Sequence, residues 1–390
     1  DTVFIAAGAR TPMGSFQGSL SNLSAIDLGA IAIKAAITRG GITGDEVEET
    51  IMGCVLSSGL RQAPARQATM KAGIPVTAGA TTINKLCGSG MKATMLAHDL
   101  IKAGTNNIMV AGGMESMTNS PYILPKAREG MRMGHGEIQD SMFTDGLEDA
   151  ASGRSMGSFA QEVADQYQLT REEMDEFAIQ SLSRAKSARD LGFLKDEIAP
   201  ITISTRRGEI EILDDEQPHK ADISRIPRLR PAFKEDGTIT AANSSSISDG
   251  ASALVLASGK VVIDKKLAPL AKFVAHATNS IEPSKFTIAP IGAIKKVMDR
   301  TGWGKDDVDL FEINEAFAMV TMIAMKELAL DPTKVNIHGG ACAQGHPIGS
   351  SGSRIIVSLL HALRARGKKK GIAALCIGGG EANAVAVEMV

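Results

Sequence analysis

Aromatic side chains are scarce in this chain. Of its 390 residues only 4% are Phe, Trp or Tyr, whereas 40 residues are glycine. Few aromatic and many glycine residues are typical of an α/β protein in which tight turns join strands to helices. No apolar run approaches the roughly 20 residues that a membrane-spanning helix needs, so we expect none. At this length two or three domains are expected.

Cysteine and net charge are also low. The four cysteines, Cys54, Cys87, Cys342 and Cys376, lie far apart and form no CxxC pair, which argues against a disulfide framework and a structural zinc site. The net charge of −2 gives no general reason to expect nucleic acid or an anionic membrane as a partner. We expect a reducing compartment and a cytoplasmic location, with the mitochondrial matrix as the alternative if a transit peptide has been removed. A strand is expected from Val3 onward, and no leader segment before it.

One cysteine lies where a strand, a turn and a helix are expected to follow one another. The stretch Thr81-Thr-Ile-Asn-Lys-Leu-Cys-Gly-Ser-Gly-Met-Lys-Ala93 predicts a buried strand, a sharp turn and a helix start. Unpaired N–H groups and the helix dipole at such a start would favour the thiolate of Cys87. The alternative is an inert cysteine at a tight turn, and this stretch alone leaves both open.

The last third of the chain echoes the first. The turn Gly88-Ser-Gly-Met-Lys92 resembles Ser350-Ser-Gly-Ser-Arg354, and in both places a helix and then a glycine-ended strand follow. A duplicated α/β unit explains this similarity. Between about residues 117 and 245 the alternation of strands and helices breaks up, although residues 170–190 predict a helix with a capping box. We therefore predict two similar halves with a looped insertion between them.

Three further stretches combine glycine with reactive or polar side chains. Asn314 ends a strand-like run, His346 lies in a loop before a helix, and Cys376 ends an apolar strand. Each residue alone has a structural explanation, such as a capped turn or a core cysteine. Together with Cys87 they place two thiols, an imidazole and an amide at strand–loop junctions, where α/β proteins build active sites. This set favours covalent acyl transfer combined with a separate proton transfer.

The motifs resemble those of the thiolase family, the acyl-CoA C-acyltransferases, across essentially the whole chain. The similarity is greatest to the short-chain acetyl-CoA C-acetyltransferase (acetoacetyl-CoA thiolase) branch. It rests on five ordered motifs: Asn84-Lys-Leu-Cys-Gly-Ser-Gly90, Val110-Ala-Gly-Gly-Met-Glu-Ser116, Asn314-Glu-Ala-Phe317, Gly345-His-Pro-Ile-Gly349 with Ser351-Gly-Ser-Arg354, and Cys376-Ile-Gly-Gly-Gly380.

The resemblance implies an α/β fold of duplicated βαβαβαββ halves, layered α-β-α-β-α, with an inserted loop domain. Residues 1–117 with 246–267 would form the N-terminal half, and residues 268–390 the C-terminal half. Residues 118–245 would form the loop domain, which holds coenzyme A and makes oligomer contacts. The implied assembly is a homotetramer, or at least a dimer, with residues 121–149 as the tetramer contact.

The resemblance also implies an activity and a role for each site residue. The activity is the reversible Claisen condensation of two acetyl-CoA to acetoacetyl-CoA and CoA through an acetyl-Cys87 intermediate. His346 would deprotonate Cys87, and Cys376 would move the α-proton of the second substrate. Asn314, through a bound water, would join His346 in one oxyanion hole. The N–H groups of Cys87 and Gly378 would form the other.

The implied substrate contacts lie mainly in the insertion. Ser245 corresponds to a serine that contacts the pantetheine part of coenzyme A. Lys220, Asp222 and Arg225 fall where the nucleotide end is held, so this basic loop is interpreted as a phosphate-binding strip rather than only a solvated face.

The chain departs from the family pattern at several positions. Ser155 stands where members often carry His, next to Met156 in the acyl pocket, so the preferred acyl chain stays open. Thr287 replaces a proline of potassium-activated members, which leaves a monovalent cation as an open alternative; no other cofactor is expected. His338 replaces an asparagine of the branch, and Cys342 matches no catalytic role.

Two other functions stay open at this point. A degradative 3-ketoacyl-CoA thiolase of broader chain length would use the same residues. A non-catalytic acyl-CoA-binding protein on the same fold would not need a second thiol. A decarboxylating condensing enzyme fits less well, because such enzymes have a Cys-His-His arrangement and this chain has Cys376.

Overall fold

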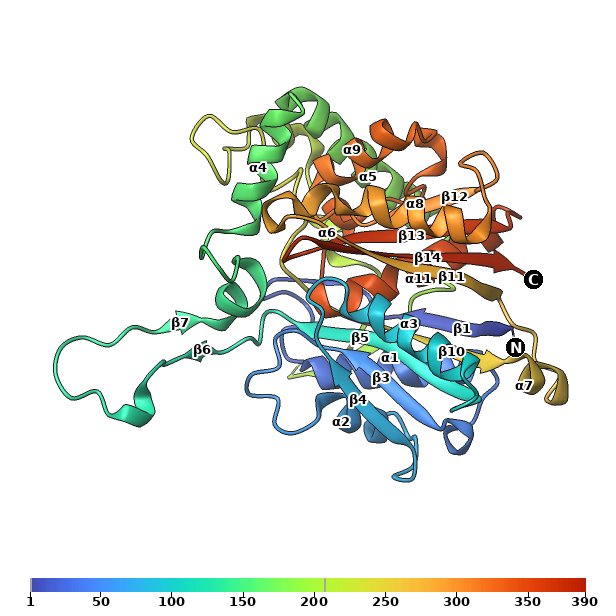
Figure 1. Ribbon diagram of the computed structural model, residues 1–390. Coiled ribbons are helices and arrows are strands. Elements are labelled where there is room, and N and C mark those ends of the chain that lie inside the picture. The colour runs from blue at the N-terminus through green and yellow to red at the C-terminus, as the bar shows by residue number, and fades with distance from the viewer. Residues whose placement is uncertain (1, 207) are drawn as a thin grey trace.

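A mixed β-sheet runs through the whole molecule. The computed structural model describes residues 2–206 and 208–390, and within them ten strands form this sheet in the order β12-β13-β14-β11-β1-β10-β5-β3-β4, with β2 paired to β10 (Figure 1). Its strands are β1 (Val3–Arg10), β2 (Gly14–Ser15), β3 (Glu49–Gly53), β4 (Gly79–Ile83), β5 (Ile108–Ser116), β10 (Ser248–Ser258), β11 (Ala271–Ser280), β12 (Leu310–Ile313), β13 (Lys370–Ile377) and β14 (Glu381–Met389).

Helices cover both faces of this sheet and fill the space between its two halves. The α-helices are α1 (Ala25–Arg39), α2 (Pro64–Lys71), α3 (Ser89–Lys102), α4 (Met156–Gln166), α5 (Arg171–Asp190), α6 (Glu216–Lys220), α7 (Gly259–Asp264), α8 (Ala289–Thr301), α9 (Ala318–Leu328), α10 (Ala341–Gln344) and α11 (Ile348–Ala365). Short 3₁₀ or π turns are η1 (Gly44–Glu46), η2 (Ala127–Glu129), η3 (Phe143–Leu147), η4 (Ile223–Arg228), η5 (Pro283–Ile288) and η6 (Pro332–Lys334).

The two halves of the sheet repeat one strand pattern. In the first half β3 is parallel to β5, and β5-β10-β1 follow antiparallel; in the second half β12 is parallel to β13, and β13-β14-β11 follow antiparallel. The counterpart of β4 is reduced to a single bridge between Phe311 and Val335. The halves meet where β1 pairs with β11 over two residues, Phe4 and Ile5. The predicted α/β fold of duplicated halves is thus confirmed, whereas the exact domain boundaries stay a prediction.

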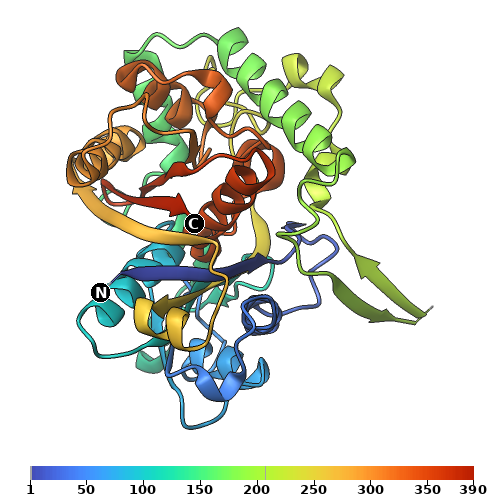
Figure 2. The same cartoon turned by 90° about the vertical axis from the view of Figure 1, so that its right-hand side faces the viewer.

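Helices α3 and α11 form the central layer between the two halves (Figures 1 and 2). Their apolar faces, together with the sheet faces that enclose them, form one core cluster, while α1 with α2 and α8 with α9 pack on the outer faces in two others. The helices touch through glycine: a Cβ on Gly90 would lie 2.5 Å from the Ser353 hydroxyl, and one on Gly352 would lie 2.5 Å from the Met91 amide nitrogen. This close approach requires glycine and brings the starts of α3 and α11 together.

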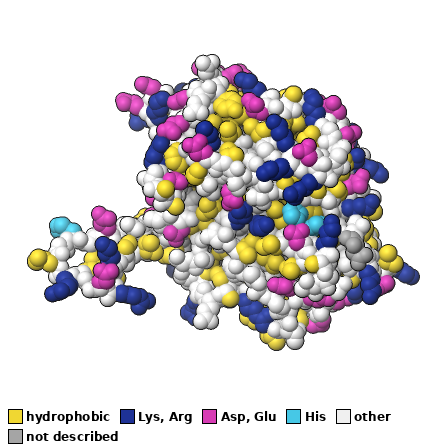
Figure 3. Space-filling model, viewed as in Figure 1, with side chains coloured by type: hydrophobic (Ala, Val, Ile, Leu, Met, Phe, Trp, Pro, Cys, Tyr) yellow, Lys and Arg dark blue, Asp and Glu magenta, His cyan; other side chains and the backbone are white. Residues whose placement is uncertain are grey.

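The inserted segment forms an arm and a helical cover. The arm is the two-stranded hairpin of β6 (Tyr122–Ile123) and β7 (Gln139–Asp140), which projects to the left in Figure 1. Its apolar side chains face outward, with Met133 98% and Tyr122 68% exposed, and Figure 3 shows apolar and charged side chains mixed on it. A second hairpin, β8 (Ile201–Thr205) and β9 (Gly208–Ile212), also protrudes (Figure 2).

Local sequence signals explain several of these elements. Thr170 caps α5 in a capping box with Glu173, as predicted. Cys54 is buried among apolar side chains and packs in the core. The strand ahead of Cys87 differs from the prediction: β4 ends at Ile83 and lies at the sheet edge, so it is partly exposed rather than buried. Among the described residues no helix combines the length and apolarity needed to cross a membrane.

Candidate active site

The turn that carries Cys87 is held by short-range hydrogen bonds. The side-chain oxygen of Asn84 accepts from the Leu86 amide at 2.9 Å, and the Ser89 hydroxyl oxygen accepts from the Lys85 amide at 2.8 Å. Leu86 itself adopts a left-handed conformation with φ of 47°. A Cβ on Gly88 would lie only 2.3 Å from the Ile377 side chain. Glycine here allows the turn to press against the end of β13.

The Cys87 thiol is protonated in the unliganded protein. Burial raises its pKa to about 11, and the charge of Glu115 acts in the same direction. Hydrogen bonds from the N–H groups of Gly378 and of Cys87 itself act in the opposite direction but are outweighed. The N–H groups at this turn do favour the thiolate, as expected, but burial outweighs them, so the thiol stays protonated in the unliganded state. The sulfur needs a base to become a nucleophile.

His346 offers one free ring nitrogen as that base. Its Nδ1 lies 2.5 Å from the Ser351 hydroxyl oxygen, which lies 3.0 Å from the carbonyl oxygen of Pro347. A carbonyl oxygen can only accept, so the Ser351 hydroxyl uses its one proton to donate to the Pro347 carbonyl oxygen. The Ser351 oxygen must then accept from His346, so the ring proton is on Nδ1. The lone pair is thus on Nε2, which has no hydrogen-bond partner among the described residues. Burial, and then the charge of Arg354, lowers the pKa of His346 to about 3, so the ring is neutral.

Cys376 and Asn314 lie at the ends of neighbouring strands. Cys376 is buried near the end of β13; burial first, and then the neighbouring Cys87, raise its pKa well above the ordinary value. Asn314 follows β12, its side-chain oxygen accepts from Arg354 at 3.4 Å, and its buried amide nitrogen has no partner in the described part of the chain. The candidate site therefore combines the protonated thiols of Cys87 and Cys376 with two unpaired nitrogens, Nε2 of His346 and the side-chain amide nitrogen of Asn314.

The duplication explains why these residues meet. Cys87 and His346 precede α3 and α11, the equivalent helices of the two halves, which pack against each other. Cys87 packs in one apolar cluster with Ile348, two residues after His346, and its sulfur accepts from the Gly378 amide at the end of β13. The structure thus gathers the predicted site residues, and the roles assigned to them stay proposals.

Two positioning residues were not predicted from the sequence. Ser351, within the Ser-Gly-Ser-Arg motif, fixes the His346 ring. Glu115 is the last residue but one of β5, and its buried carboxylate accepts from the amides of Val55, Leu56 and Gly349 at 3.1, 3.0 and 2.9 Å. Burial raises the pKa of Glu115 to about 7, although these hydrogen bonds lower it. Both lie inside motifs that the sequence displays, but their contacts depend on the fold.

The predicted acyl-pocket residues lie at the start of α4. The Met156 sulfur lies 3.4 Å from the position that a Cβ on Gly378 would occupy, so this side chain faces the region of the Cys87 sulfur. Ser155 is the N-cap of α4, and its hydroxyl oxygen accepts from the Ser158 amide at 3.3 Å. A helix cap is a structural reason for serine at this position.

The predicted coenzyme A residues line a single cleft. Ser245, Lys220, Asp222 and Arg225 all border a cavity of about 600 Å³. The Ser245 hydroxyl donates to the Ala316 carbonyl oxygen at 2.9 Å, and Asp222 caps η4 through the Ser224 amide. Ile247 borders this cleft and also belongs to the apolar cluster around Cys87. The cleft therefore leads towards the thiol, and Cys342 lies on its wall.

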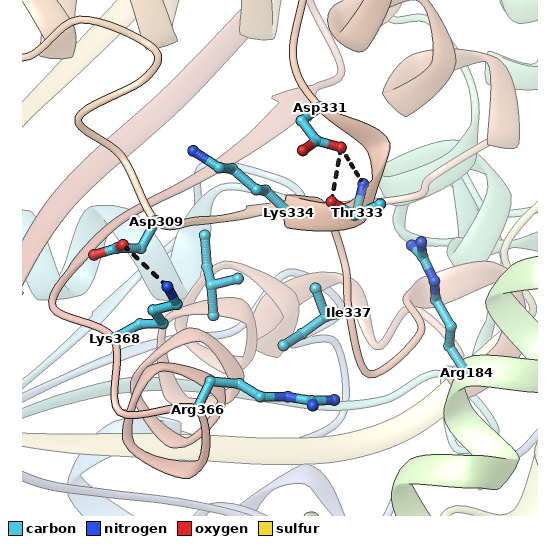
Figure 4. Close-up of a pocket in the computed structure, with 9 residues that line it drawn as sticks. Arg184, Asp309, Asp331, Thr333, Lys334, Ile337, Arg366 and Lys368 are labelled. Carbon is cyan, nitrogen blue, oxygen red and sulfur yellow. Dashed lines mark hydrogen bonds and ion pairs between the residues drawn. The ribbon is translucent and has the colours of Figure 1, made fainter.

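A second cavity of similar size, about 590 Å³, lies away from the thiols (Figure 4). Figure 4 shows Arg184, Arg366 and Lys368 around it, together with Asp309 and Asp331. It borders the beginning of β12, whereas Asn314 follows the end of that strand. No thiol lines this cavity, and its Asp331 carboxylate is occupied by Thr333. It is not the site of the expected chemistry.

Comparison with known proteins agrees with this arrangement. The thiolase N-terminal domain family matches residues 3–260, and the thiolase C-terminal domain family matches residues 267–389. The chain is 47% identical over 388 residues to an acetyl-CoA acetyltransferase of Chromobacterium violaceum, covering 99% of each chain. The crystal structure of Bacillus anthracis acetyl-CoA acetyltransferase superposes with a TM-score of 0.97 at 41% identity, covering 100% of this chain and 99% of that one. A thiolase from Ascaris suum in complex with coenzyme A gives a TM-score of 0.95 at 41% identity, covering 100% of both chains.

Proposed function

The chain belongs to the thiolase family, and we propose that it catalyses the reversible condensation of two acetyl-CoA to acetoacetyl-CoA and CoA. The observation that carries this proposal is a pair of neighbouring neutral thiols, Cys87 and Cys376, beside a neutral histidine with a free Nε2. A protein that only bound acyl-CoA would need neither the second thiol nor the base. Relatives with 45–48% identity over almost their full length carry the name acetyl-CoA acetyltransferase.

In the first half-reaction Cys87 takes the acetyl group. Its thiol proton passes to Nε2 of His346, and the sulfur attacks the thioester carbonyl carbon of acetyl-CoA. The carbon–sulfur bond to CoA breaks, and the leaving CoA sulfur takes the thiol proton of Cys376. This step leaves acetyl-Cys87, a Cys376 thiolate and an imidazolium at His346. The tetrahedral oxyanion would accept hydrogen bonds from the amides of Cys87 and Gly378, both of which are close enough to the sulfur to lower its pKa.

In the second half-reaction the carbon–carbon bond forms. The Cys376 thiolate removes an α-proton from a second acetyl-CoA, and the enolate carbon attacks the acetyl carbonyl carbon on Cys87. The carbon–sulfur bond to Cys87 breaks, and Cys87 recovers its proton from His346. The enolate oxygen accepts from Nε2–H of His346 and, through a bound water, from Asn314, whose amide nitrogen is otherwise unpaired among the described residues. Loss of one such donor typically costs about 3–4 kcal/mol of transition-state stabilisation.

The same proposal assigns the cleft to coenzyme A. Lys220 and Arg225 would face the nucleotide phosphates, with Asp222 beside them, and Ser245 would contact the pantetheine near the thiol. Met156 and Ser155 would border the acyl group. All proton transfers are carried by side chains of the chain, so we propose that the reaction needs no organic or metal cofactor; activation by a monovalent cation stays an open alternative.

Self-association and location follow as further parts of the proposal. The apolar side chains of the arm, among them Tyr122 and Met133, would pack against a second copy, giving a dimer or a tetramer. Four free cysteines fit a reducing compartment, either the cytoplasm or the mitochondrial matrix. Size-exclusion chromatography with light scattering, in the presence and absence of the arm, tests the assembly.

Acetoacetyl-CoA thiolysis by the wild type and by Cys87→Ala tests the activity. We expect the variant to lose it, and undiminished thiolysis would refute the proposal. Labelling of Cys87 by iodoacetamide, with protection by acetyl-CoA, separates catalysis from simple binding. A panel of 3-ketoacyl-CoA substrates addresses the broader-chain alternative, which activity rising beyond four carbons would favour.

A further inference from the structure

Two histidines and an aspartate meet near the C-terminal end of α3, whose N-terminal end adjoins Cys87. One oxygen of the Asp99 carboxylate lies 2.9 Å from Nδ1 of His98 and 2.8 Å from Nε2 of His276. One potential ligand atom from each residue lies within 4.8 Å of the other two. Within residues 2–206 and 208–390 no other group of three His, Cys, Asp or Glu side chains meets this condition. Figure 3 shows His and acidic side chains side by side on the face over α3 and β11.

A β-bulge turns His276 towards this group. Phe273 and His276 are three residues apart on β11, so in a regular strand they would point to opposite faces. The pairing of β11 with β14 shifts between Phe273 and Ala275, and the extra residue places both rings on one side. Phe273 stacks on the His98 ring with centroids 4.4 Å apart, and His276 meets the same ring edge-on at 5.2 Å. Ring packing therefore fixes both imidazoles before any ligand arrives.

The donor atoms of the group suit a cation. One Asp99 carboxylate oxygen already faces an imidazole nitrogen of His98 and one of His276, at 2.9 and 2.8 Å. A neutral imidazole offers a metal ion the lone pair of one ring nitrogen. The His98 side chain is only 5% exposed, whereas Asp99 is exposed and free to adjust. Two positive side chains nearby oppose a cation: Lys102, one turn along α3, and Arg300, whose guanidinium donates to the His276 carbonyl oxygen.

We propose that His98, Asp99 and His276 form a binding site for a divalent transition metal ion of the zinc class. Two imidazole nitrogens and one carboxylate oxygen, with a position left for water, are a ligand set of Zn²⁺, Co²⁺ and Ni²⁺ and not of Mg²⁺ or Ca²⁺. Tetrahedral Zn²⁺ holds its ligand atoms about 3.3 Å apart, which requires the Asp99 oxygen to retreat by about half an ångström. When the ion binds, the proton on Nδ1 of His98 is replaced by one on Nε2, and the proton on Nε2 of His276 by one on Nδ1. Each imidazole only changes its tautomer, so the binding step releases no proton.

The site would join the two halves of the molecule. His98 and Asp99 belong to α3, which begins next to Cys87, and His276 belongs to the first strand of the C-terminal half. An ion that binds the folded chain only will raise the midpoint of thermal unfolding as its concentration increases. The ion would bind near the last turn of α3, whereas Cys87 precedes the first turn, and it takes no part in the proposed acyl transfer, so the two proposals can fail independently.

The test titrates Co²⁺ into EDTA-treated protein and follows the visible spectrum and the unfolding midpoint. We expect one Co²⁺ per chain, the bands of a tetrahedral nitrogen–oxygen site without a sulfur-to-cobalt band, and competition by Zn²⁺. His276→Ala should weaken binding by at least about 10- to 100-fold. His135→Ala, which removes an exposed histidine on the arm, is the matched control and should bind as the wild type does.

A second variant, Asp99→Asn, tests the proposal even if His276→Ala misfolds. Asp99→Asn keeps an oxygen that accepts from both imidazoles but removes the charge, so it should fold normally and lose affinity as well. Absence of Co²⁺ binding to the wild type would overturn the proposal. So would unchanged affinity in both His276→Ala and Asp99→Asn, or a spectrum dominated by a sulfur-to-cobalt band, which would place the ion at Cys87 and Cys376.

Discussion

The Nδ1 atom of His346 lies 2.5 Å from the hydroxyl oxygen of Ser351, and this contact decides which ring nitrogen can take a proton. The Ser351 hydroxyl donates its hydrogen bond to the Pro347 carbonyl oxygen. The Ser351 oxygen therefore accepts from Nδ1–H of His346, and Nε2 is left unprotonated. The base of the proposed reaction is therefore set by a hydroxyl on the first turn of α11 and not by a carboxylate. A hydroxyl leaves the imidazole neutral, which matches its low pKa.

Ser351→Ala should lower kcat for acetoacetyl-CoA thiolysis by about 5- to 30-fold with little change in KM. The reason is the loss of one hydrogen bond that holds the tautomer, worth about 1–2 kcal/mol. Ser351→Thr keeps the hydroxyl and should recover most of the rate. Ser358→Ala, on the same helix but remote from His346, is the control and should leave kcat unchanged. Equal losses in the Ala and Thr variants would contradict a positioning role.

Cys87→Ala should reduce thiolysis by more than about 1,000-fold, because no other side chain at the turn can accept the acetyl group. Stopped-flow measurement of CoA release from acetyl-CoA provides the sharper assay, since it reports the first half-reaction alone. Cys376→Ala should still take up acetyl groups, slowly, but should not exchange the α-protons of acetyl-CoA in D₂O. If the Cys376→Ala variant still exchanged the α-protons of acetyl-CoA, Cys376 could not be the group that removes them.

The buried neutral histidine should make the protein sensitive to acid. In the folded chain the pKa of His346 is about 3, whereas the ordinary value is 6.5, so between these pH values the unfolded chain binds the additional proton. Stability therefore rises with pH in this window and is lost on acidification, by about 1.4 kcal/mol per pH unit from this group. Urea titrations between pH 4 and 7 give the free energy of unfolding as a function of pH. In His346→Gln the slope of this plot should be smaller by the amount that one proton contributes. An identical slope would contradict burial of the neutral ring.

Much of this architecture could be predicted from the sequence because it is duplicated. The similar Ser-Gly turns near residues 88 and 350 predict that Cys87 and the His346 loop precede equivalent helices, and the repeated strand order confirms it. The direction of the Cys87 pKa could not be predicted in this way. Helix-start geometry is local and visible in the sequence, whereas burial depends on the chain packed around the turn from the other half. Likewise the β-bulge between Phe273 and Ala275 could not be predicted, because the sequence there contains no glycine or other turn residue that would indicate it.

The cleft makes a separate prediction about binding. Lys220→Ala with Arg225→Ala should raise KM for CoA substrates by about 5- to 30-fold and leave kcat nearly unchanged, since both charges are at an open rim remote from the thiols. The loss should shrink at high salt, because exposed charges are screened. Lys260→Ala, which removes a cation outside the cleft, is the control. A fall in kcat without a change in KM would place these residues elsewhere in the reaction.

The acyl preference depends on the contact between Met156 and Gly378. The Met156 sulfur lies 3.4 Å from the position of a Cβ on Gly378, so this side chain limits the space beyond the Cys87 sulfur. Met156→Ala should open that space and raise the ratio of six-carbon to four-carbon 3-ketoacyl-CoA thiolysis by about 10-fold, in line with one or two methylene groups of new contact. Ser155→Ala provides the comparison: it should lower the free energy of unfolding by about 1 kcal/mol through the lost helix cap but leave the ratio unchanged. If Ser155→Ala alone shifted the ratio, the pocket would be bounded by the cap of α4 and not by Met156.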